Sequence, residues 1–302
     1  MAQLLTSYVT PSVLRAAPTG ISWNSLPTSK TGQSADATVM DICWRATSRV
    51  DAYCGTPLRA TINTEQVEGP DFYMTIDGAG ARITLSRPPV VKVTGITVQS
   101  TANFTAAPTV VTPSTQWRVQ NPLMGEYGSM APDSSGVLPY AVRLASGWVN
   151  WSQGRNGYLV TVTYVNGWPH AGLTSACAAG DTTLVVDDCT GMTGMAITIR
   201  DSVNTEVVQI ATASATSGPG TLTLAAGTPS AQYPHDAGVV ATTLPQVIEL
   251  AAIKFATDEA LLRGAMTISA PAMPSQSSST GAPAATLTES AELLCHPFRR
   301  VI

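Results

Sequence analysis

Two stretches that lie far apart in the chain decide the fold. The first, residues 158–168 (YLVTVTYVNGW), predicts a strand that runs into an Asn-Gly turn. The second, residues 244–264 (LPQVIELAAIKFATDEALLRG), predicts an amphipathic helix. Its apolar face carries Ile248, Ala251, Ala252, Phe255 and Leu262. Residues 169–243 separate the two stretches and show a different pattern, so we expect one domain with a second, smaller domain inserted into it.

The composition limits the class of protein. A chain of 302 residues is long enough for about two domains of roughly 100–200 residues each. Charged residues make up 12% of the chain, about half of the roughly 25% that is usual. A surface so poor in charge suggests contact with other protein. The net charge of −4, without any basic run, argues against tight binding of nucleic acid.

The sequence also bears on the compartment. No apolar run approaches the roughly 20 residues that a membrane helix needs. The first residues, MAQLLTSY, lack the basic region and apolar stretch of a signal peptide. The cysteines are an odd, scattered set that fits reduced thiols better than a disulfide framework. They are Cys43, Cys54, Cys177, Cys189 and Cys295. We therefore expect a protein made in a cytosol.

Helices are predicted near the start of the chain and strands after them. Residues 10–15 begin with a Thr N-cap and a Pro at the first helical position. Residues 37–53 repeat apolar side chains at three- and four-residue steps, and Gly55 provides the left-handed cap. Strands are expected at 60–66, 72–76, 81–85, 90–98, 116–119, 140–144 and 158–165.

Two connections in this region are predicted from local signals. The turn at Asp77-Gly78 predicts a hairpin between strands 72–76 and 81–85. Strands 140–144 and 158–165 are interpreted as a final pair, with a turn containing Trp148 and Trp151 between them. Residues 120–139 are rich in Gly, Pro and Ser and predict a long exposed loop.

The inserted segment has evenly spaced short strands and Gly-containing turns. The strands are predicted at 182–187, 195–200, 205–211, 221–224 and 238–242. Five strands over about 70 residues favour a small all-β barrel or sandwich. The fold class is therefore α+β, in which N-terminal helices and the helix 245–264 form a helical core with an antiparallel β-sheet.

The predicted domains follow from this pattern. Residues 1–168 plus 244–264 form the core domain, and residues 169–243 form the inserted all-β module. Residues 265–286 are a flexible linker by composition. Residues 287–302 are expected to be a C-terminal docking arm that folds on contact with a partner. Its apolar residues, the candidate interaction residues, are Leu293, Leu294, Phe298, Val301 and Ile302.

The sequence offers no pattern typical of catalysis, of a metal site or of a cofactor site. The three histidines, His170, His235 and His296, are not spaced as a metal-binding pair. His235 precedes Asp236, and a turn explains the pair better than an acid–base dyad does. Asp187 and Asp188 are interpreted as a strand end that leaves toward water rather than as a cation site.

Four tryptophans, Trp117, Trp148, Trp151 and Trp168, could form a platform for sugars, but they are more often core or interface anchors. We therefore expect no enzyme, no metal and no cofactor.

The order of the elements resembles that of the head–tail connector (adaptor) proteins of tailed bacteriophages. The resemblance rests on a helix ending RVDAYCG, an RPPV join between strands, VTVTYVNGW, and then LPQVIELAAI with LLRG. It covers roughly residues 10–168 and 244–264. Within it, the helix 37–53, the strands that follow and the helix 245–263 correspond to the family's common unit. The inserted segment resembles a small β module of some phage structural proteins, whereas family members without it connect the strand directly to the helix.

The resemblance implies a virion structural protein at the neck between head and tail. Such proteins form rings, commonly of twelve copies, that contact the portal protein on one side and a tail-side connector, stopper or tail protein on the other. Packaged DNA passes through the lumen without sequence-specific binding, and an acidic chain suits such a channel. No membrane is involved, and the protein is made in the host cytoplasm. A stopper, a tail terminator or another tail structural protein is the alternative, and a carbohydrate- or cell-surface-binding module is a more distant one.

Overall fold

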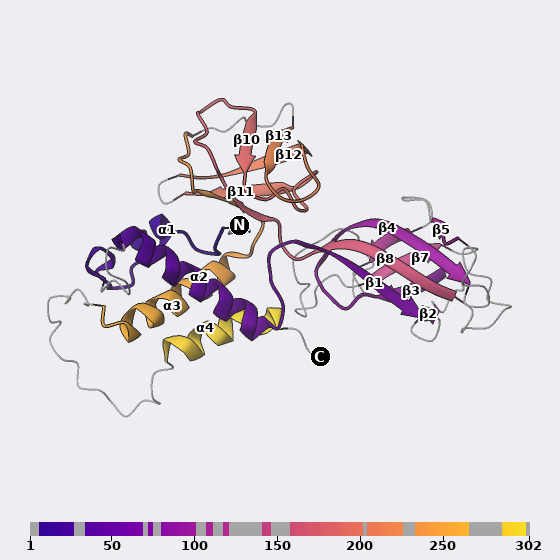
Figure 1. Cartoon of the computed structure of the whole chain (residues 1–302), viewed down its shortest axis with the longest axis horizontal. Helices are drawn as coiled ribbons and strands as arrows, with labels where there is room; N and C mark the ends of the chain where they lie inside the picture. The colour runs from indigo at the N-terminus through magenta and orange to yellow at the C-terminus, as the bar shows by residue number, and fades with distance from the viewer. Residues whose placement is uncertain are drawn as a thin grey trace. The chain divides into compact units, whose positions relative to one another are not determined.

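The computed structural model describes residues 6–26, 34–68, 72–74, 80–100, 107–110, 117–120, 141–145, 158–201, 204–225, 233–265 and 286–299 (Figure 1). Within it the chain forms two compact units. One comprises Met1–Leu58 and His170–Ile302, and the other comprises Arg59–Pro169. Helices and antiparallel sheets are both present, so the predicted α+β class is confirmed.

The helices of the first unit begin and end where local signals place them. They are α1 (Pro11–Ala16), η1 (Trp23–Ser25), α2 (Ala35–Cys54), α3 (Gln246–Leu262), α4 (Leu287–Cys295) and η4 (His296–Phe298). Ser34 caps α2 by accepting a hydrogen bond from Ala37 N, 3.1 Å away. Gly55 ends α2 with a φ of 72°, a left-handed conformation that glycine adopts without steric cost. The helix predicted at 37–53 is therefore confirmed.

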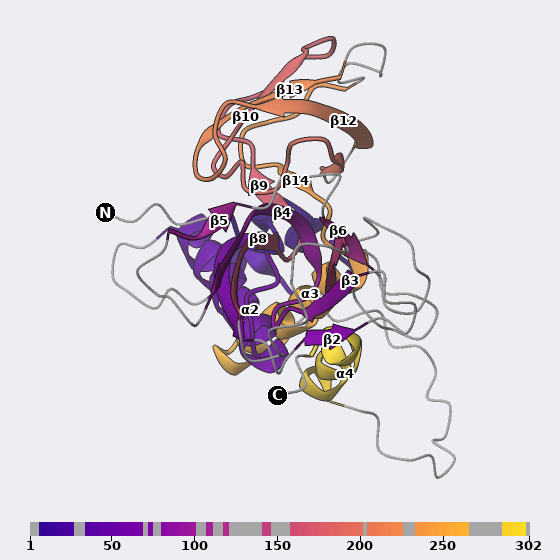
Figure 2. The ribbon, with the colours of Figure 1, turned by 90° about the vertical axis from the view of Figure 1, so that its right-hand side faces the viewer.

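The same unit contains a small β-barrel. Its strands are β9 (His170–Gly172), β10 (Thr183–Val186), β11 (Ala196–Arg200), β12 (Thr205–Ala213), β13 (Gly220–Leu224) and β14 (Val240–Thr242), paired in the order β10-β13-β12-β11-β14-β9. Beyond the end of β9, Thr174 N donates to the Val185 carbonyl at 2.9 Å, and Asp187 N donates to the Gly172 carbonyl at 3.0 Å. These two bonds join the outermost strands and close the curled sheet into a barrel (Figure 2). The barrel alternative of the prediction is therefore correct.

The barrel has a core of its own. Alternate residues of β10 and β12 point inward, as the period of two in a strand requires. Met192 and Leu184 are among the largest fully buried side chains, and they pack with buried residues from every strand of the barrel. This core consists only of residues between 171 and 241, so the barrel has an apolar core of its own.

The second unit consists of two four-stranded antiparallel sheets. The first has the order β1-β8-β4-β5 and the second β2-β3-β7-β6. The strands are β1 (Thr61–Glu68), β2 (Phe72–Met74), β3 (Gly80–Thr84), β4 (Val90–Ser100), β5 (Thr109–Val110), β6 (Trp117–Gln120), β7 (Ala141–Ala145) and β8 (Tyr158–Asn166). Ile83 of β3 lies in one apolar cluster with Val162 and Tyr164 of β8, so the two sheets share a core. The hairpin predicted between 72–76 and 81–85 is confirmed by the pairing of β2 with β3.

The predicted pairing of strands 140–144 and 158–165 is wrong. The strand β7 pairs with β3 and β6, whereas β8 pairs with β1 and β4 in the other sheet. In the structure β8 lies between β1 and β4 and pairs with both of them along almost its whole length. In that position both edges of β8 are hydrogen-bonded, which a five-residue partner such as β7 could not provide along its whole length. Residues 120–139, except Gln120, and the turn with Trp148 and Trp151 lie outside the described residues.

The grouping into compact units differs from the expected domain boundaries. The sequence places the strands 60–165 and the helices in one core domain, with residues 169–243 inserted. In the structure, the barrel and the helices belong to one unit and the sandwich of β1–β8 forms the other. The sandwich closes its own core, and the barrel is bound to the helices by hydrogen bonds described below, which accounts for this division.

Candidate functional site

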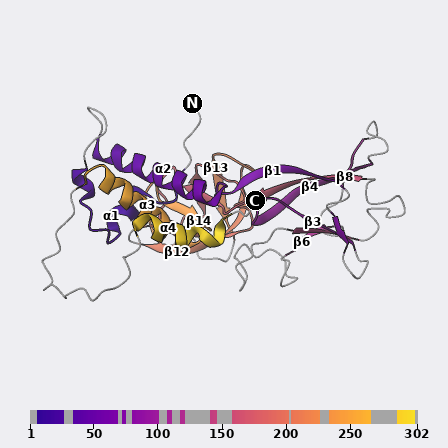
Figure 3. The same cartoon turned by 90° about the horizontal axis from the view of Figure 1, so that it is seen from below.

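The helices α2 and α3 pack side by side and form the centre of the candidate site (Figure 3). Apolar side chains of α3 are buried at Ile248, Ala251, Ala252, Phe255, Ala256 and Ala260. Those of α2 are buried at Val39, Ile42, Cys43, Ala46 and Val50. The small alanines of α3 allow the two helices to approach closely. The packing of these two helices is the contact that the sequence predicts, and it is confirmed.

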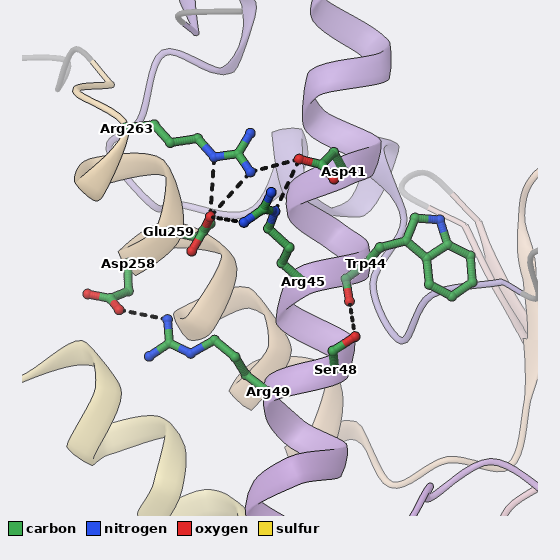
Figure 4. A network of polar contacts seen from close by, with 8 residues as sticks. All are labelled: Asp41, Trp44, Arg45, Ser48, Arg49, Asp258, Glu259 and Arg263. Carbon is green, nitrogen blue, oxygen red and sulfur yellow. Dashed lines mark hydrogen bonds and ion pairs between the residues drawn. The ribbon is translucent and has the colours of Figure 1, made fainter. Parts of the chain in front are cut away.

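An ion-pair network runs across one end of this contact (Figure 4). Arg263 Nη2 lies 2.7 Å from Asp41 Oδ2 and 3.2 Å from Glu259 Oε1. Arg45 lies between the same two acids, 3.2 Å from Asp41 and 3.6 Å from Glu259. Two arginines and two acids thus alternate between α2 and α3. Because residue 41 of α2 meets residue 263 of α3, the two helices are antiparallel.

The electrostatics of the network centre on Asp41. Burial raises the pKa of its carboxyl, but the hydrogen bond from Arg263 and the charges of Arg45 and Arg263 outweigh burial and hold the pKa below the ordinary value. The charged form of Asp41 is therefore the form that stabilises the fold.

A second cluster joins three helices. Arg49 of α2 donates from Nη1 to Asp258 of α3 at 2.8 Å and from Nη2 to Thr288 Oγ1 of α4 at 3.0 Å. Thr288 Oγ1 also donates to Asp258 Oδ2 at 3.0 Å. The Arg49 guanidinium stacks over the Phe255 ring, 4.5 Å from its centroid. One arginine therefore holds α2, α3 and α4 together.

The helix α4 occupies the region predicted as a docking arm. A capping box begins it, in which Thr286 and Glu289 bond each other's backbone N–H groups. Ala291, Cys295 and Phe298 are buried against the rest of the unit. Arg299 then lies over the Tyr53 ring of α2, 5.6 Å from its centroid. In this conformation the segment is a folded helix on its own chain.

The predicted interaction residues divide into three groups. Leu293 is exposed, with 69% of its surface accessible, and Leu294 is half-buried. Phe298 is buried and therefore serves the internal packing of η4 in this conformation. Val301 and Ile302 lie outside the described residues. Two exposed leucines outside the expected apolar face lie on α3, Leu250 and Leu261. The assignment of Leu262 to that apolar face is wrong, because Leu262 ends α3 beyond its last buried residue, Ala260, and is 76% exposed.

The N-terminal segment Thr6–Thr10 is a strap between the barrel and the helices. Asp187 of the barrel accepts hydrogen bonds from Thr6 N at 2.9 Å and Thr6 Oγ1 at 2.7 Å. On the other side, Tyr8 N donates to Thr47 Oγ1 of α2 at 2.9 Å. A Cβ atom at Gly172 would clash with the Thr6 side chain, so only glycine leaves room for the strap there.

His170, which the sequence leaves without a role, belongs to this strap. Its Nδ1 lies 2.9 Å from Thr242 Oγ1 and its Nε2 lies 3.0 Å from the Ser7 carbonyl. Its ring meets Tyr8 edge to face, with 5.5 Å between the ring centroids. The buried imidazole thus joins the first and last strands of the barrel to the strap.

The interpretation of Asp187 and Asp188 as a strand end facing water is wrong. Both are buried, at 6% and 7% exposure. Besides the strap, Asp187 accepts a bond from Gly172 N at 2.7 Å. Asp188 Oδ1 accepts from Thr190 N, Thr190 Oγ1 and Gly218 N. Buried carboxylates need such donors. Thr190 is a local partner two residues from Asp188, whereas Gly172, Gly218 and Thr6 lie too far along the chain to be seen as local signals.

His235 has acidic neighbours but no access to solvent. Its Nε2 lies 2.7 Å from Glu206 Oε1, its Nδ1 lies 3.4 Å from Asp201 Oδ2, and its side chain is fully buried. Its backbone pairs with that of Cys177, which fixes the segment before the turn at 237–238. A substrate cannot reach the imidazole in this conformation, so the cluster orders the barrel.

A cavity of about 480 Å³ lies between α1, the barrel and α3. Its charged lining residues are Arg200, Asp201 and Glu249. The charge of Arg200 is neutralised, because it lies 3.0 Å from Glu249 and donates to the Leu244 carbonyl at 2.8 Å. The cavity therefore presents no unpaired arginine to an anion.

Within the described part of the chain, no group of three His, Cys, Asp or Glu side chains could hold a metal ion. Nor does any helix there have the length and apolar character needed to cross a membrane.

No protein-family model matches the sequence, and no curated protein matches it. Among solved structures, the chain is similar to one described as "Neck of empty GTA particle computed with C6 symmetry". The superposition covers 99% of this chain and 97% of that one, with 14% sequence identity and a TM-score of 0.35. A similarity of this size does not assign the chain to a family.

Proposed function

We propose that this chain is a virion structural protein that forms a ring-shaped head-to-tail connector in the neck of a tailed-phage-like particle. In this proposal several copies, commonly twelve in the family that the sequence resembles, assemble between the portal protein and a tail-side protein. The packaged DNA passes through the lumen.

The observation that carries the proposal is the pairing of α2 with α3. The resemblance predicts that these helices, at 37–53 and 245–263, form one unit although the strands and the inserted module separate them. In the structure, ion pairs join residues as far apart in sequence as Asp41 and Arg263, which are separated by 222 positions. An ion-pair network and a buried apolar seam at the same contact make it a specific packing.

The outer surface of this helical unit supports assembly with other protein. Leu262 at the end of α3 and Leu293 on α4 are 76% and 69% exposed. Large apolar side chains that remain uncovered on a chain with only 12% charged residues favour burial in a contact between subunits. In the proposed ring, α4 supports this surface from within its own subunit, and Leu293 takes part in the contact.

Two kinds of alternative to the connector remain, another type of neck ring and a carbohydrate-binding module. A stopper or tail terminator would also be a neck ring, and the same helical unit would serve it. For a carbohydrate-binding module, the described part of the barrel offers no tryptophan, and Trp168 is buried. The net charge of −4 suits a channel that lets DNA pass without holding it.

Electron microscopy of particles that carry a tagged copy of the chain tests the proposal. We expect the tag at the junction of head and tail, in a ring coaxial with the portal. A tag on the capsid shell or the tail tip, or particles without the chain, would refute it.

The subunit contact is tested with paired variants of the full chain. Leu262→Asp and Leu293→Asp place charge on the exposed helical surface, and we expect loss of ring assembly by mass photometry with unchanged thermal unfolding. Val207→Asp is the matched control, because Val207 is 61% exposed but lies on the barrel. Equal assembly of all three variants would exclude the helical surface as the contact.

A further inference from the structure

Two thiols meet where α2 and α4 end. Cys54 is the last residue of α2 and Cys295 is the last residue of α4. Both side chains are fully buried, and Cys54 Sγ lies 3.9 Å from the Cys295 carbonyl oxygen although 241 positions separate the residues. The Cys54 thiol thus points at the main chain of Cys295, at the end of α4. All five cysteines of the chain are free in this structure.

The pair differs chemically from the other thiols. The interaction with the Cys54 thiol lowers the pKa of Cys295, whereas the same interaction, together with burial, raises the pKa of Cys54. Elsewhere, burial raises the pKa of Cys43 to about 12, and burial with the nearby acids raises that of Cys177 to about 11. Because the thiolate is the nucleophile in disulfide exchange, this interaction favours Cys295 as the attacking thiol of the pair.

The position of α4 gives reagents a route to the pair. This helix has nine residues, fewer than the roughly 12–15 that an isolated helix needs for marginal stability in water. It therefore depends on its contacts with α2 and α3, and local opening that releases α4 exposes Cys295. Cys43 lies within α2 itself and gains no such access.

We propose that Cys54 and Cys295 are a redox-sensitive pair whose oxidation by a small-molecule disulfide fastens α4 to α2. The Cys295 thiolate attacks one sulfur of oxidised glutathione, forms a mixed disulfide and releases one glutathione thiolate, which takes up a proton. The Cys54 thiol then loses its proton and attacks the Cys295 sulfur, which forms the protein disulfide and releases the second glutathione. Two protein thiols are oxidised and one glutathione disulfide is reduced to two thiols. This proposal does not depend on the ring assembly.

The experiment uses the full-length reduced protein incubated with oxidised glutathione and then alkylated. We expect two of the five thiols to escape alkylation together, and a cross-linked pair of tryptic peptides spanning 50–59 and 264–299. The melting temperature should rise by about 5 °C or more, since the cross-link constrains a long loop of the unfolded chain. Cys54→Ser should trap glutathione on Cys295 as a mixed disulfide, and Cys295→Ser should give no cross-link.

Cys43→Ser is the matched control, because Cys43 is equally buried on the same helix, and it should cross-link like the natural protein. Urea-unfolded protein treated in parallel confirms that the oxidant is active. The proposal is overturned if the folded protein forms no 54–295 cross-link while the unfolded protein is oxidised. It is also overturned if another pair of cysteines links first, or if the mixed disulfide persists on Cys295 with Cys54 present.

Discussion

Removing the Asp187 carboxylate is the sharpest test of how the barrel is held to the helices. In Asp187→Ala, the N–H groups of Thr6 and Gly172 lose their acceptor at a position that is 6% exposed. A buried donor without a partner costs about 1–3 kcal/mol, so two of them should destabilise the closed strap by about 2–6 kcal/mol. The strap should then open more often, while the barrel core stays packed.

Hydrogen exchange of the peptide spanning residues 6–14 measures this opening directly. Every 1.4 kcal/mol corresponds to about a tenfold change in an equilibrium constant, so a loss of about 3 kcal/mol should speed exchange there by about 100-fold. Core amides of the barrel should change far less.

Two further variants isolate the contact. Asp181→Ala is the control, because Asp181 accepts a single bond, from Ala178 N at 2.8 Å, at an exposed position. Thr6→Val, combined with Asp187→Ala in a double-mutant cycle, should show a coupling of about 1 kcal/mol or more. If residues 6–14 exchange at the natural rate in folded Asp187→Ala, the strap is not held by this carboxylate and the reasoning is wrong.

Three other substitutions test the helical unit. Arg49→Met should lower the free energy of unfolding by about 1–3 kcal/mol in urea titrations, because it removes the partly exposed pair with Asp258, the bond to α4 and the stacking on Phe255. Phe255→Ala should cost about 3–5 kcal/mol by the same measurement, since the ring is 2% exposed. Asp41→Asn tests the pH dependence: because the folded-state pKa of Asp41 lies below its ordinary value of 3.8, its stabilisation is complete above that value and is lost as the pH falls through the folded-state pKa. The melting temperature of Asp41→Asn should therefore be lower than that of the natural protein at neutral pH, and the difference should shrink in acid. A difference that stays constant down to acid pH would contradict this reading.

Local sequence signals were sufficient for the elements with strong periodicity. The helix at 37–53 and its glycine cap, the helix at 245–264 and five of the six strands of the barrel all follow from spacing that each segment carries in itself. The strand that was missed is β9, which has only three residues. The packing of α2 on α3 was also expected, because the order of elements resembles that of a known family.

Contacts between distant residues could not be predicted in the same way. The hydrogen bonds between Thr6 and Asp187 join positions that are 181 residues apart, and neither residue belongs to a sequence pattern that indicates its partner. The same is true of Arg49 and Thr288, which are 239 positions apart. A strand such as β8 can be recognised from its own residues, but those residues do not show which strands it pairs with. The role of the candidate interaction residues stays a prediction, and the sequence does not show that Phe298 is buried within its own chain whereas Leu293 is exposed.

The pairing of β9 with β14 has a consequence for how such a chain can gain or lose its barrel. His170 lies opposite Thr242 in an antiparallel ladder, so the main chain leaves the barrel beside the point where it enters. Opposed residues in such a ladder lie about 4.5–5.5 Å apart, a gap that one or two glycines can span. The barrel is therefore connected to the rest of the chain through two adjacent, paired strands. A chain in which the barrel is deleted between these two strands can keep the rest of its backbone in place. The strap residues Ser7 and Tyr8 must then be buried by other residues.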